Sequence, residues 1–230
     1  MKFNIIGLIL ALAFSITASA KNNALTAIDI ALEPDAIMKA YAQQINKRLL
    51  KAYPEGFALD ATHHPHITLV QCYVRTASLD KVYAAISKRL AEGNEGNKQL
   101  KAYQYNIYPW QGLGVAVVAI KPTAELFKLQ HDLVKAVAPY TVKTGTAAAF
   151  YTTVDSPDIN QSTINYVVKF IPEASGKNYH PHLTLGVATL AYLKTLLAQP
   201  VAEFTFIPAG VTIYQLGNYG TARNKLKTWG

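Results

Sequence analysis

The chain has 230 residues, of which 16% are charged and 50% are hydrophobic, which is an ordinary globular composition with no disordered or collagenous bias. Its single cysteine, Cys72, excludes an internal disulfide, so the stability of the protein must come from packing. The formal net charge of +8 favours anionic partners such as nucleotides or RNA, but the charge alone identifies none of them.

The first twenty residues have the pattern of a secretory signal peptide. Lys2 precedes the apolar run IIGLILALAF, and the small residues ASA at positions 18–20 form a cleavage site. The apolar run is shorter than the roughly 20 residues that a membrane-spanning helix needs, and no later segment is long and apolar enough to span. We therefore expect cleavage before Lys21 and a periplasmic or secreted protein that has no membrane contact after cleavage.

The remaining chain alternates between expected strands and expected helices. A strand at 24–34 leads to a helix that begins near Pro34, and a strand at 65–74 leads to a helix capped by Ser78. Strands at 100–108 and 115–120 precede a third helix, which opens at Pro122. Residues 139–178 are expected to be irregular apart from one strand, INYVVKFI at 164–171. A strand at 182–187, a helix over TLAYLKTLLAQ and strands at 202–206 and 211–216 complete the pattern.

The two halves of the chain repeat one order of elements. IDIALEPDAIMKAYAQQINKRL and VAVVAIKPTAELFKLQHDLVKA each contain a strand, a proline and an amphipathic helix, and each leads to an HPH[IL]TL strand and a further helix. This indicates an internal duplication. It predicts an α+β fold with two similar lobes, each an antiparallel-type sheet with flanking helices, around a central cleft. We expect residues 21–230 to form one bilobal domain with interleaved lobes, and a monomer.

The second repeat is longer than the first. Pro34 and His66 are 32 positions apart, whereas Pro122 and His182 are 60 apart, so the second repeat has about 28 extra residues (60 − 32). Most of them fall in the expected irregular region. They are candidates for a lid that selects the substrate, although the sequence does not show which substrate that is.

The repeated strand presents two histidines and two threonines. Because side chains alternate along a strand, His66 and Thr68 lie on one face of HPHITLV, as His182 and Thr184 do on HPHLTLG. Two imidazoles and two hydroxyls around one small anion suit in-line attack at phosphorus. A neutral imidazole accepts a proton from the attacking hydroxyl or water, and an imidazolium donates one to the leaving oxygen. This chemistry needs no metal or other cofactor, and the sequence does not decide which histidine is the base.

At these residues the chain resembles the 2H phosphoesterase superfamily, which includes 2′-5′ RNA ligase-like and 2′,3′-cyclic nucleotide phosphodiesterase-like enzymes. HIT at 66–68 and HLT at 182–184 match its motif at every position. The resemblance implies metal-independent hydrolysis of 2′,3′-cyclic phosphates on nucleotides or RNA ends, with His66 and His182 as the acid-base pair. It also implies that Thr68 and Thr184 bind the phosphate. Some relatives join or cleave 2′-5′ linkages.

Other interpretations of the same residues stay open. His64 and His180 share a face with the inner histidines and are candidates for supporting residues that orient them or widen the site. The histidine cluster, with Asp60 nearby, also allows a periplasmic zinc- or copper-binding protein, although that leaves the paired threonines unexplained. A third hypothesis is a non-catalytic protein that binds an anion or oligonucleotide. The C-terminal segment NYGTARNKL is expected to form a turn and ordinary surface.

Overall fold

The computed structural model describes residues 24–93, 99–110, 112–201 and 203–230. The predicted signal peptide lies outside the described residues. The helices are α2 (Ala36–Ala52), α3 (Leu79–Glu92), α4 (Ala124–Val137), α5 (Gln161–Ala174) and α6 (Leu190–Leu197). The strands are β1 (Leu25–Glu33), β2 (Ile67–Arg75), β3 (Leu100–Trp110), β4 (Leu113–Ile120), β5 (Thr141–Val142), β6 (His182–Thr189), β7 (Phe204–Phe206), β8 (Gly210–Leu216) and β9 (Ala222–Trp229).

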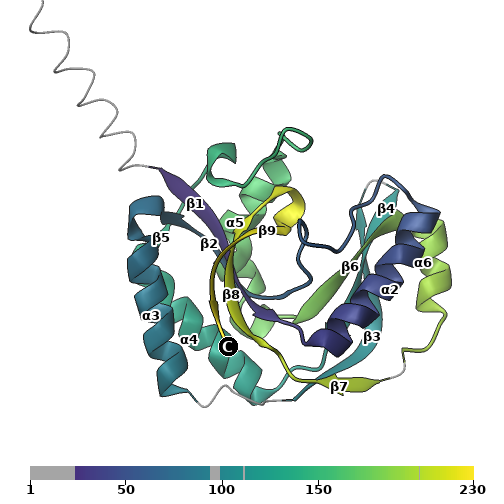
Figure 1. The fold of residues 1–230 in the computed structure, drawn as a ribbon, viewed down its shortest axis with the longest axis horizontal. Helices are drawn as coiled ribbons and strands as arrows, with labels where there is room; N and C mark the ends of the chain where they lie inside the picture. The colour runs from purple at the N-terminus through teal and green to yellow at the C-terminus, as the bar shows by residue number, and fades with distance from the viewer. Residues whose placement is uncertain (1–23, 94–98, 111, 202) are drawn as a thin grey trace, which may run out of the picture.

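The described strands form one curled antiparallel sheet with flanking helices, which confirms the predicted α+β class (Figure 1). The first half-sheet has the order β2-β1-β8-β9, with β5 added to β2, and the second half-sheet has the order β7-β3-β4-β6. The two sheets expected from the sequence are thus joined, since β2 pairs with β6 at Ile67 and Leu183. This junction brings the two repeated strands together.

Each half-sheet takes strands from both repeats. The first half-sheet combines β1 and β2 of the first repeat with β8 and β9 from the end of the chain, and the second combines β4 and β6 with β3 of the first repeat. The helices cross over as well, because α2 packs on β6 while α4 packs on β2. Neither repeat therefore builds a complete half of the protein by itself.

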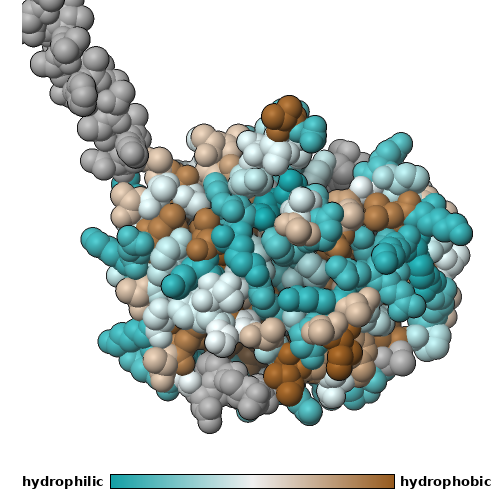
Figure 2. Space-filling model, in the orientation of Figure 1, coloured by the Kyte–Doolittle hydropathy of each residue, from teal (hydrophilic) through white to brown (hydrophobic). Residues whose placement is uncertain are grey.

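One hydrophobic core lies between the sheet and the helices on its outer face. It includes Ile28 and Ile30 of β1, Leu49 of α2, Leu133 of α4 and Leu183 of β6, all fully buried. We call the opposite face of the sheet the inner face. In the described part of the chain no helix is both long and apolar enough to cross a bilayer. Figure 2 shows hydrophilic residues spread over both halves of the molecule, with small hydrophobic patches between them.

The extra residues of the second repeat are ordered, and the predicted strand at 164–171 is wrong, because this segment belongs to α5. Its β-branched residues favoured a strand, but Ile164, Val167 and Phe170 recur at helical spacing and are the buried ones. Asn160 caps the helix by accepting a hydrogen bond from the Thr163 backbone N–H at 2.7 Å. The helix packs on the inner face of the first half-sheet, against Tyr73 and its neighbours.

The C-terminal segment forms the expected turn at Asn218–Gly220, but it then continues as a strand that the sequence analysis did not predict. Residues 222–229 form β9, which pairs with β8 at the end of the first half-sheet. The sequence NYGTARNKL did not predict this strand, because β9 is an edge strand that is only partly buried and therefore has many polar residues. The carbonyl of Ala222 accepts a hydrogen bond from the His64 N–H at 3.0 Å. The missed strand therefore holds the chain where it enters the first HPH motif.

Candidate functional site

The two predicted motifs meet at the junction between β2 and β6. Ile67 pairs with Leu183, and both side chains are fully buried in the core. The residues that flank them, His66 with Thr68 and His182 with Thr184, alternate to the inner face and are all partly buried. The structure thus brings together all four residues that the sequence analysis singled out. An approximate twofold axis through the Ile67–Leu183 pair relates the two motifs.

Matching β-bulges follow the two motifs. In the β1–β2 ladder the register shifts between the pairs Ala31–Thr68 and Ile30–Val70, which leaves Leu69 as the extra residue. In the β4–β6 ladder it shifts between Val117–Thr184 and Ala116–Gly186, which leaves Leu185 as the extra residue. Bulges often lie beside active sites, where they redirect side chains. Here both come directly after the threonine of the motif.

Each inner histidine is oriented by the backbone of the outer one. Nδ1 of His66 lies 2.7 Å from the carbonyl oxygen of His64, and Nδ1 of His182 lies 2.7 Å from that of His180. Because a carbonyl oxygen only accepts hydrogen bonds, each Nδ1 carries the hydrogen, which leaves Nε2 for proton transfer. His64 and His180 thus contact the inner histidines through their carbonyls. The side chain of His180 is exposed.

A buried carboxylate that the sequence analysis missed lies beside the first motif. Asp29 of β1 is completely buried, and its Oδ2 accepts hydrogen bonds from Thr68 Oγ1 at 2.7 Å and Gln71 Nε2 at 3.0 Å. The same oxygen lies 3.4 Å from His66 Nε2. The only signal in the sequence was one aspartate within the apolar strand LTAIDIALE, because a buried charge needs a partner.

The bulge explains why Gln71 shares this site. Strict alternation from Thr68 would direct residues 70 and 72 to the inner face. The extra residue Leu69 resets the alternation, so that Thr68 and Gln71, three positions apart, both reach Asp29. Val70 and Cys72 instead belong to the core.

A model of the 2′-5′ RNA ligase superfamily matches residues 34–217. The chain belongs to this superfamily. The match contains both HPH motifs, and it confirms the resemblance to 2H phosphoesterases that the motifs indicate. A comparison with curated protein sequences found no match.

Solved structures of other proteins are similar to the chain over most of its length. The structure of TT0787 of Thermus thermophilus has a TM-score of 0.53 and 17% identity, covers 89% of this chain and 97% of its own, and shares the fold. E. coli LigT complexed with ATP has a TM-score of 0.45 and 12% identity, with coverages of 90% and 97%. Kluyveromyces marxianus Usb1 with uridine monophosphate has a TM-score of 0.39 and 11% identity, with coverages of 90% and 100%.

The two histidines of this superfamily member have different electrostatic surroundings. Burial alone would lower the pKa of His66, but the Asp29 carboxylate beside it raises that pKa above its ordinary value. Burial lowers the pKa of His182, and the charge of His66 lowers it further. His66 therefore favours the imidazolium form, whereas His182 favours neutral imidazole.

Tyrosine rings contact both histidines. The Tyr214 ring lies 5.1 Å from the His64 ring and 6.2 Å from the His66 ring, and its hydroxyl donates to Glu33 Oε1 at 2.6 Å. The Tyr108 ring lies 5.7 Å from the His182 ring and is 46% exposed. Although burial would raise the pKa of Glu33, hydrogen bonds from Lys225 and Tyr214 lower it to about 2. A permanent carboxylate therefore lies behind Tyr214.

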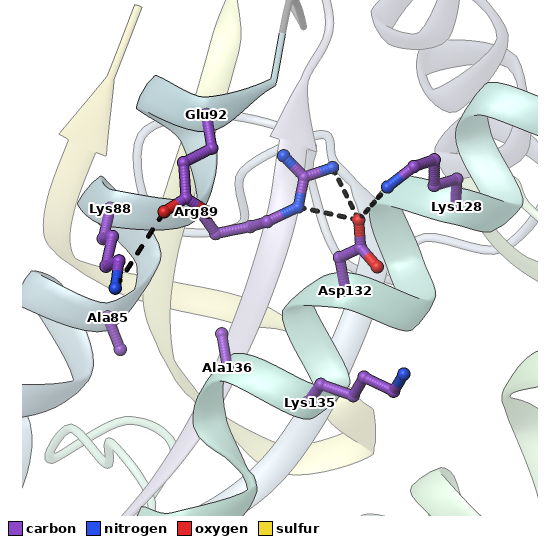
Figure 3. Close-up of a pocket in the computed structure, with 8 residues that line it drawn as sticks. All are labelled: Ala85, Lys88, Arg89, Glu92, Lys128, Asp132, Lys135 and Ala136. Atoms are coloured by element: carbon purple, nitrogen blue, oxygen red, sulfur yellow. Dashed lines mark hydrogen bonds and ion pairs between the residues drawn. The ribbon is translucent and has the colours of Figure 1, made fainter.

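A groove of about 480 Å³ lies elsewhere, between α3 and α4 (Figure 3). Arg89 of α3 pairs with Asp132 across the two helices, and the other ion pairs lie within one helix. Asp132 contacts Arg89 at 2.9 Å and Lys128 at 2.5 Å, and Lys88 lies 4.0 Å from Glu92. None of the motif residues lines this groove, so we do not assign the site to it.

The described residues contain no cluster of side chains that would form the metal site considered from the sequence. No group of three or more histidine, cysteine, aspartate or glutamate side chains is placed there to hold an ion. Asp60, the carboxylate considered from the sequence, accepts hydrogen bonds from the backbone N–H groups of Thr62 and His63 instead. His63 in turn contacts Arg223 through Nε2 at 2.8 Å.

Proposed function

We propose that the protein is a metal-independent phosphodiesterase that hydrolyses 2′,3′-cyclic phosphates on nucleotides or RNA ends. The observation that carries this proposal is the meeting of two His-x-Thr motifs about the Ile67–Leu183 pair, with both imidazoles oriented through Nδ1. Membership of the 2′-5′ RNA ligase superfamily supports a phosphodiesterase-type activity. The cyclic substrate and the two-histidine mechanism are our inferences.

Hydrolysis of a cyclic phosphodiester requires one proton acceptor and one proton donor on opposite sides of the phosphorus. Two oriented imidazoles of different proton affinity meet that requirement, and each acid-base group contributes about 10²- to 10⁴-fold in rate. The reaction needs water as its only second reactant. It forms the bond from the water oxygen to phosphorus and breaks one ring bond to a ribose oxygen.

Thr184 is the better placed of the two hydroxyls to bind a phosphate oxygen. Its hydroxyl has no hydrogen-bond partner among the residues that the structure describes, so its hydrogen is available to a non-bridging oxygen. Thr68 already donates its hydrogen to Asp29. We infer that Thr184 stabilises the charge that develops on the phosphate, in the manner of an oxyanion hole.

The predicted signal peptide directs this activity outside the cytoplasm, and we propose a periplasmic or secreted monomer. The net charge of +8 is consistent with polyanionic substrates such as RNA fragments. The charge also predicts that the rate of association with RNA falls as the salt concentration rises.

The test uses purified residues 21–230 with 2′,3′-cyclic AMP and with a short RNA that ends in a cyclic phosphate, both in excess EDTA. We expect turnover that EDTA does not affect and that falls by at least about 100-fold in His66→Ala and in His182→Ala. His131→Ala is the matched control, because His131 is an exposed histidine on α4. Loss of turnover in EDTA would support the metal hypothesis instead. Binding of both ligands without turnover would support the non-catalytic hypothesis.

A further inference from the structure

The approximate twofold symmetry breaks beside the histidines. The two half-sheets can be compared position by position from their bulges. Ala31 pairs with Thr68 in the first half-sheet, and the equivalent pair in the second is Val117 with Thr184. Two residues earlier, Asp29 pairs with Gln71 in the first half-sheet. The corresponding pair in the second half-sheet is Val115 with Val187. A carboxylate and an amide thus lie beside His66, where the equivalent positions beside His182 hold two valines.

We propose that Asp29 is a positioning residue that keeps the His66 imidazole protonated, so that His66 is the proton donor and His182 the proton acceptor. This inference rests on the proposed function and assigns the two roles that the sequence leaves open. It also fixes the direction of the reaction within the site. The attacking water lies on the Val115 side, and the leaving ribose oxygen lies on the Asp29 side.

The burial of Asp29 is the first argument. A fully buried carboxylate is unfavourable unless it is paired, and the donors to Asp29 among the described residues are neutral groups, Thr68 and Gln71. Its Oδ1 has no partner among the described atoms. His66 is the group in contact with the carboxylate that becomes a cation on protonation, and the pair is stabilised in this form.

The contact distance is the second argument. At 3.4 Å, His66 Nε2 is farther from Asp29 Oδ2 than the 2.7–3.2 Å that is usual for an N–H···O hydrogen bond. The carboxylate therefore favours the charged form of His66 without holding its proton in a short bond. The Nε2 proton remains transferable to a substrate oxygen.

The other titratable groups that interact electrostatically with Asp29 are Cys72, Tyr166, Tyr179, Tyr214 and His182. Burial raises the pKa of Cys72 to about 12 and that of Tyr166 to about 12, and it also raises those of Tyr179 and Tyr214. These four groups are thus neutral between pH 5 and 9. Of His66 and the groups named above, the two histidines are thus the ones that change charge in that range.

The reaction step follows with its protons balanced. The water oxygen forms a bond to phosphorus while its proton passes to Nε2 of His182. The bond from phosphorus to one ribose oxygen breaks, and that oxygen takes the Nε2 proton of His66. The step ends with a phosphomonoester, neutral His66 and protonated His182, and proton exchange with solvent restores the starting forms.

The first arm of the test does not depend on turnover. NMR titration of the imidazole resonances in residues 21–230 measures the midpoint for each histidine. We expect His66 to titrate at a higher pH than His182, and Asp29→Asn, which preserves the size of the side chain, to lower the His66 midpoint by at least one pH unit. Val115→Asp should raise the His182 midpoint. Glu33→Gln is the control, because Glu33 acts on His64 and should leave His66 unchanged.

The second arm compares leaving groups in pH-rate profiles. With 2′,3′-cyclic AMP, whose ribose leaving group needs a proton, Asp29→Asn should lose about 10- to 100-fold in kcat at pH 8 and recover as the pH falls. With bis(p-nitrophenyl) phosphate, whose leaving group needs none, the variant should stay within about threefold of the wild type.

The outcomes separate the two proposals. The expected order of midpoints without turnover of any phosphodiester would overturn the proposed function and leave the protonation of His66 standing. Turnover with His182 titrating above His66, or an Asp29→Asn variant whose His66 midpoint does not fall, would overturn the role of Asp29 alone. An equal loss on both leaving groups would also contradict it, because a purely structural defect affects both substrates.

Discussion

Thr68 and Thr184 occupy equivalent positions in the two motifs, but their hydroxyls have different surroundings. The Thr68 hydroxyl donates to the buried carboxylate of Asp29, whereas the hydroxyl of Thr184 is unpaired within the described residues. The motif alone predicts the same role for both threonines, whereas the structure places their hydroxyls in different surroundings. The difference arises from β1, which the motif does not include.

This difference predicts that the same substitution lowers activity at position 184 and stability at position 68. Thr184→Val should lower kcat/KM for 2′,3′-cyclic AMP by about 10- to 100-fold, since a hydrogen bond to a charged group contributes about 1.5–3 kcal/mol. Thr68→Val should lower the free energy of unfolding by about 1–3 kcal/mol, because Asp29 loses a donor while it stays buried. Steady-state kinetics and urea denaturation of both variants measure the two effects. Equal kinetic losses with unchanged stability would contradict the assignment.

His63 gives a second prediction for a single residue, concerning stability in acid. Burial and the charge of Arg223 lower its pKa from 6.5 to about 4, so the folded protein resists the protonation that the unfolded chain accepts. Stability is therefore lost as the pH falls through 6.5 towards 4. The raised pKa of His66 acts in the opposite direction, because its contribution is complete below 6.5 and is lost at higher pH.

The measurement is the melting temperature of wild type and His63→Gln between pH 7 and 4.5. The wild type should lose more stability over this range than the variant, which has no group at this position to protonate. Parallel curves would show that His63 does not cause the loss. His131→Gln controls for the removal of an exposed histidine.

Sequence reasoning identified the four motif residues because their chemistry and spacing are local. It missed Asp29 and Gln71 because their contact depends on strand pairing and on a bulge, neither of which has a local signal. It expected a supporting role for His64 and His180, and the structure places their backbone carbonyls against the inner histidines. Such contacts cannot be predicted from residue types, because every residue has a backbone carbonyl.

Among the elements, α2 carries a polar residue that links the two halves of the site region. Asn46 is buried, and its Nδ2 donates to the carbonyls of Leu185 at 2.8 Å and Phe57 at 3.0 Å. Its Oδ1 accepts from the Leu59 N–H at 2.9 Å. Gly186 lies so close that an added Cβ would be 2.8 Å from Nδ2, and its φ of +143° favours glycine. The helix thereby fixes the bulge that follows the second motif.

Removing this amide should destabilise the protein. Asn46→Ala leaves the buried carbonyl of Leu185, the partly buried carbonyl of Phe57 and the buried N–H of Leu59 without this partner, so we expect a loss of about 2–5 kcal/mol in the free energy of unfolding. Gln43→Ala is the control on the same helix, because Gln43 is exposed and makes one bond of 3.2 Å to the Leu59 carbonyl. Urea denaturation compares the two. A loss for Asn46→Ala no larger than that of the control would contradict the linking role.

Element prediction succeeded where periodicity was long and failed where it was short or mixed. The helices after Pro34, Ser78 and Pro122 were predicted well, since each apolar stripe extends over several turns, although the Ser78 side chain makes no capping hydrogen bond. The β-branched residues of INYVVKFI are typical of a strand, and the N-cap that starts the helix, Asn160, lies outside this segment. β9 was missed because an edge strand has a weak apolar pattern.

At the scale of the whole molecule, the exchange of strands between repeats governs how the protein folds. The first half-sheet is incomplete without β8 and β9, and the second is incomplete without β3. The repeated sequence was sufficient to predict the duplication and the α+β class. The joining of the halves into one sheet depends on the contact between β2 and β6, which sequence patterns do not reveal.

We therefore expect neither repeat to fold alone. Fragments 21–111 and 112–230, expressed separately, should give no cooperative unfolding transition, whereas the chain of residues 21–230 should unfold in one step. Coincident denaturation curves from circular dichroism and tryptophan fluorescence test this expectation. A folded, cooperative fragment would contradict it.

The approximate twofold axis also bears on how the two repeats of one chain can come to differ. Two identical copies of a single repeat, assembled as a symmetric dimer, would carry the same residue beside both histidines, because a twofold interface repeats every contact. In a single chain the two repeats can differ, so position 29 holds an aspartate while the equivalent position 115 holds a valine. Covalent linkage of the two repeats thus allows a different residue beside each histidine, which a symmetric dimer of identical chains does not allow.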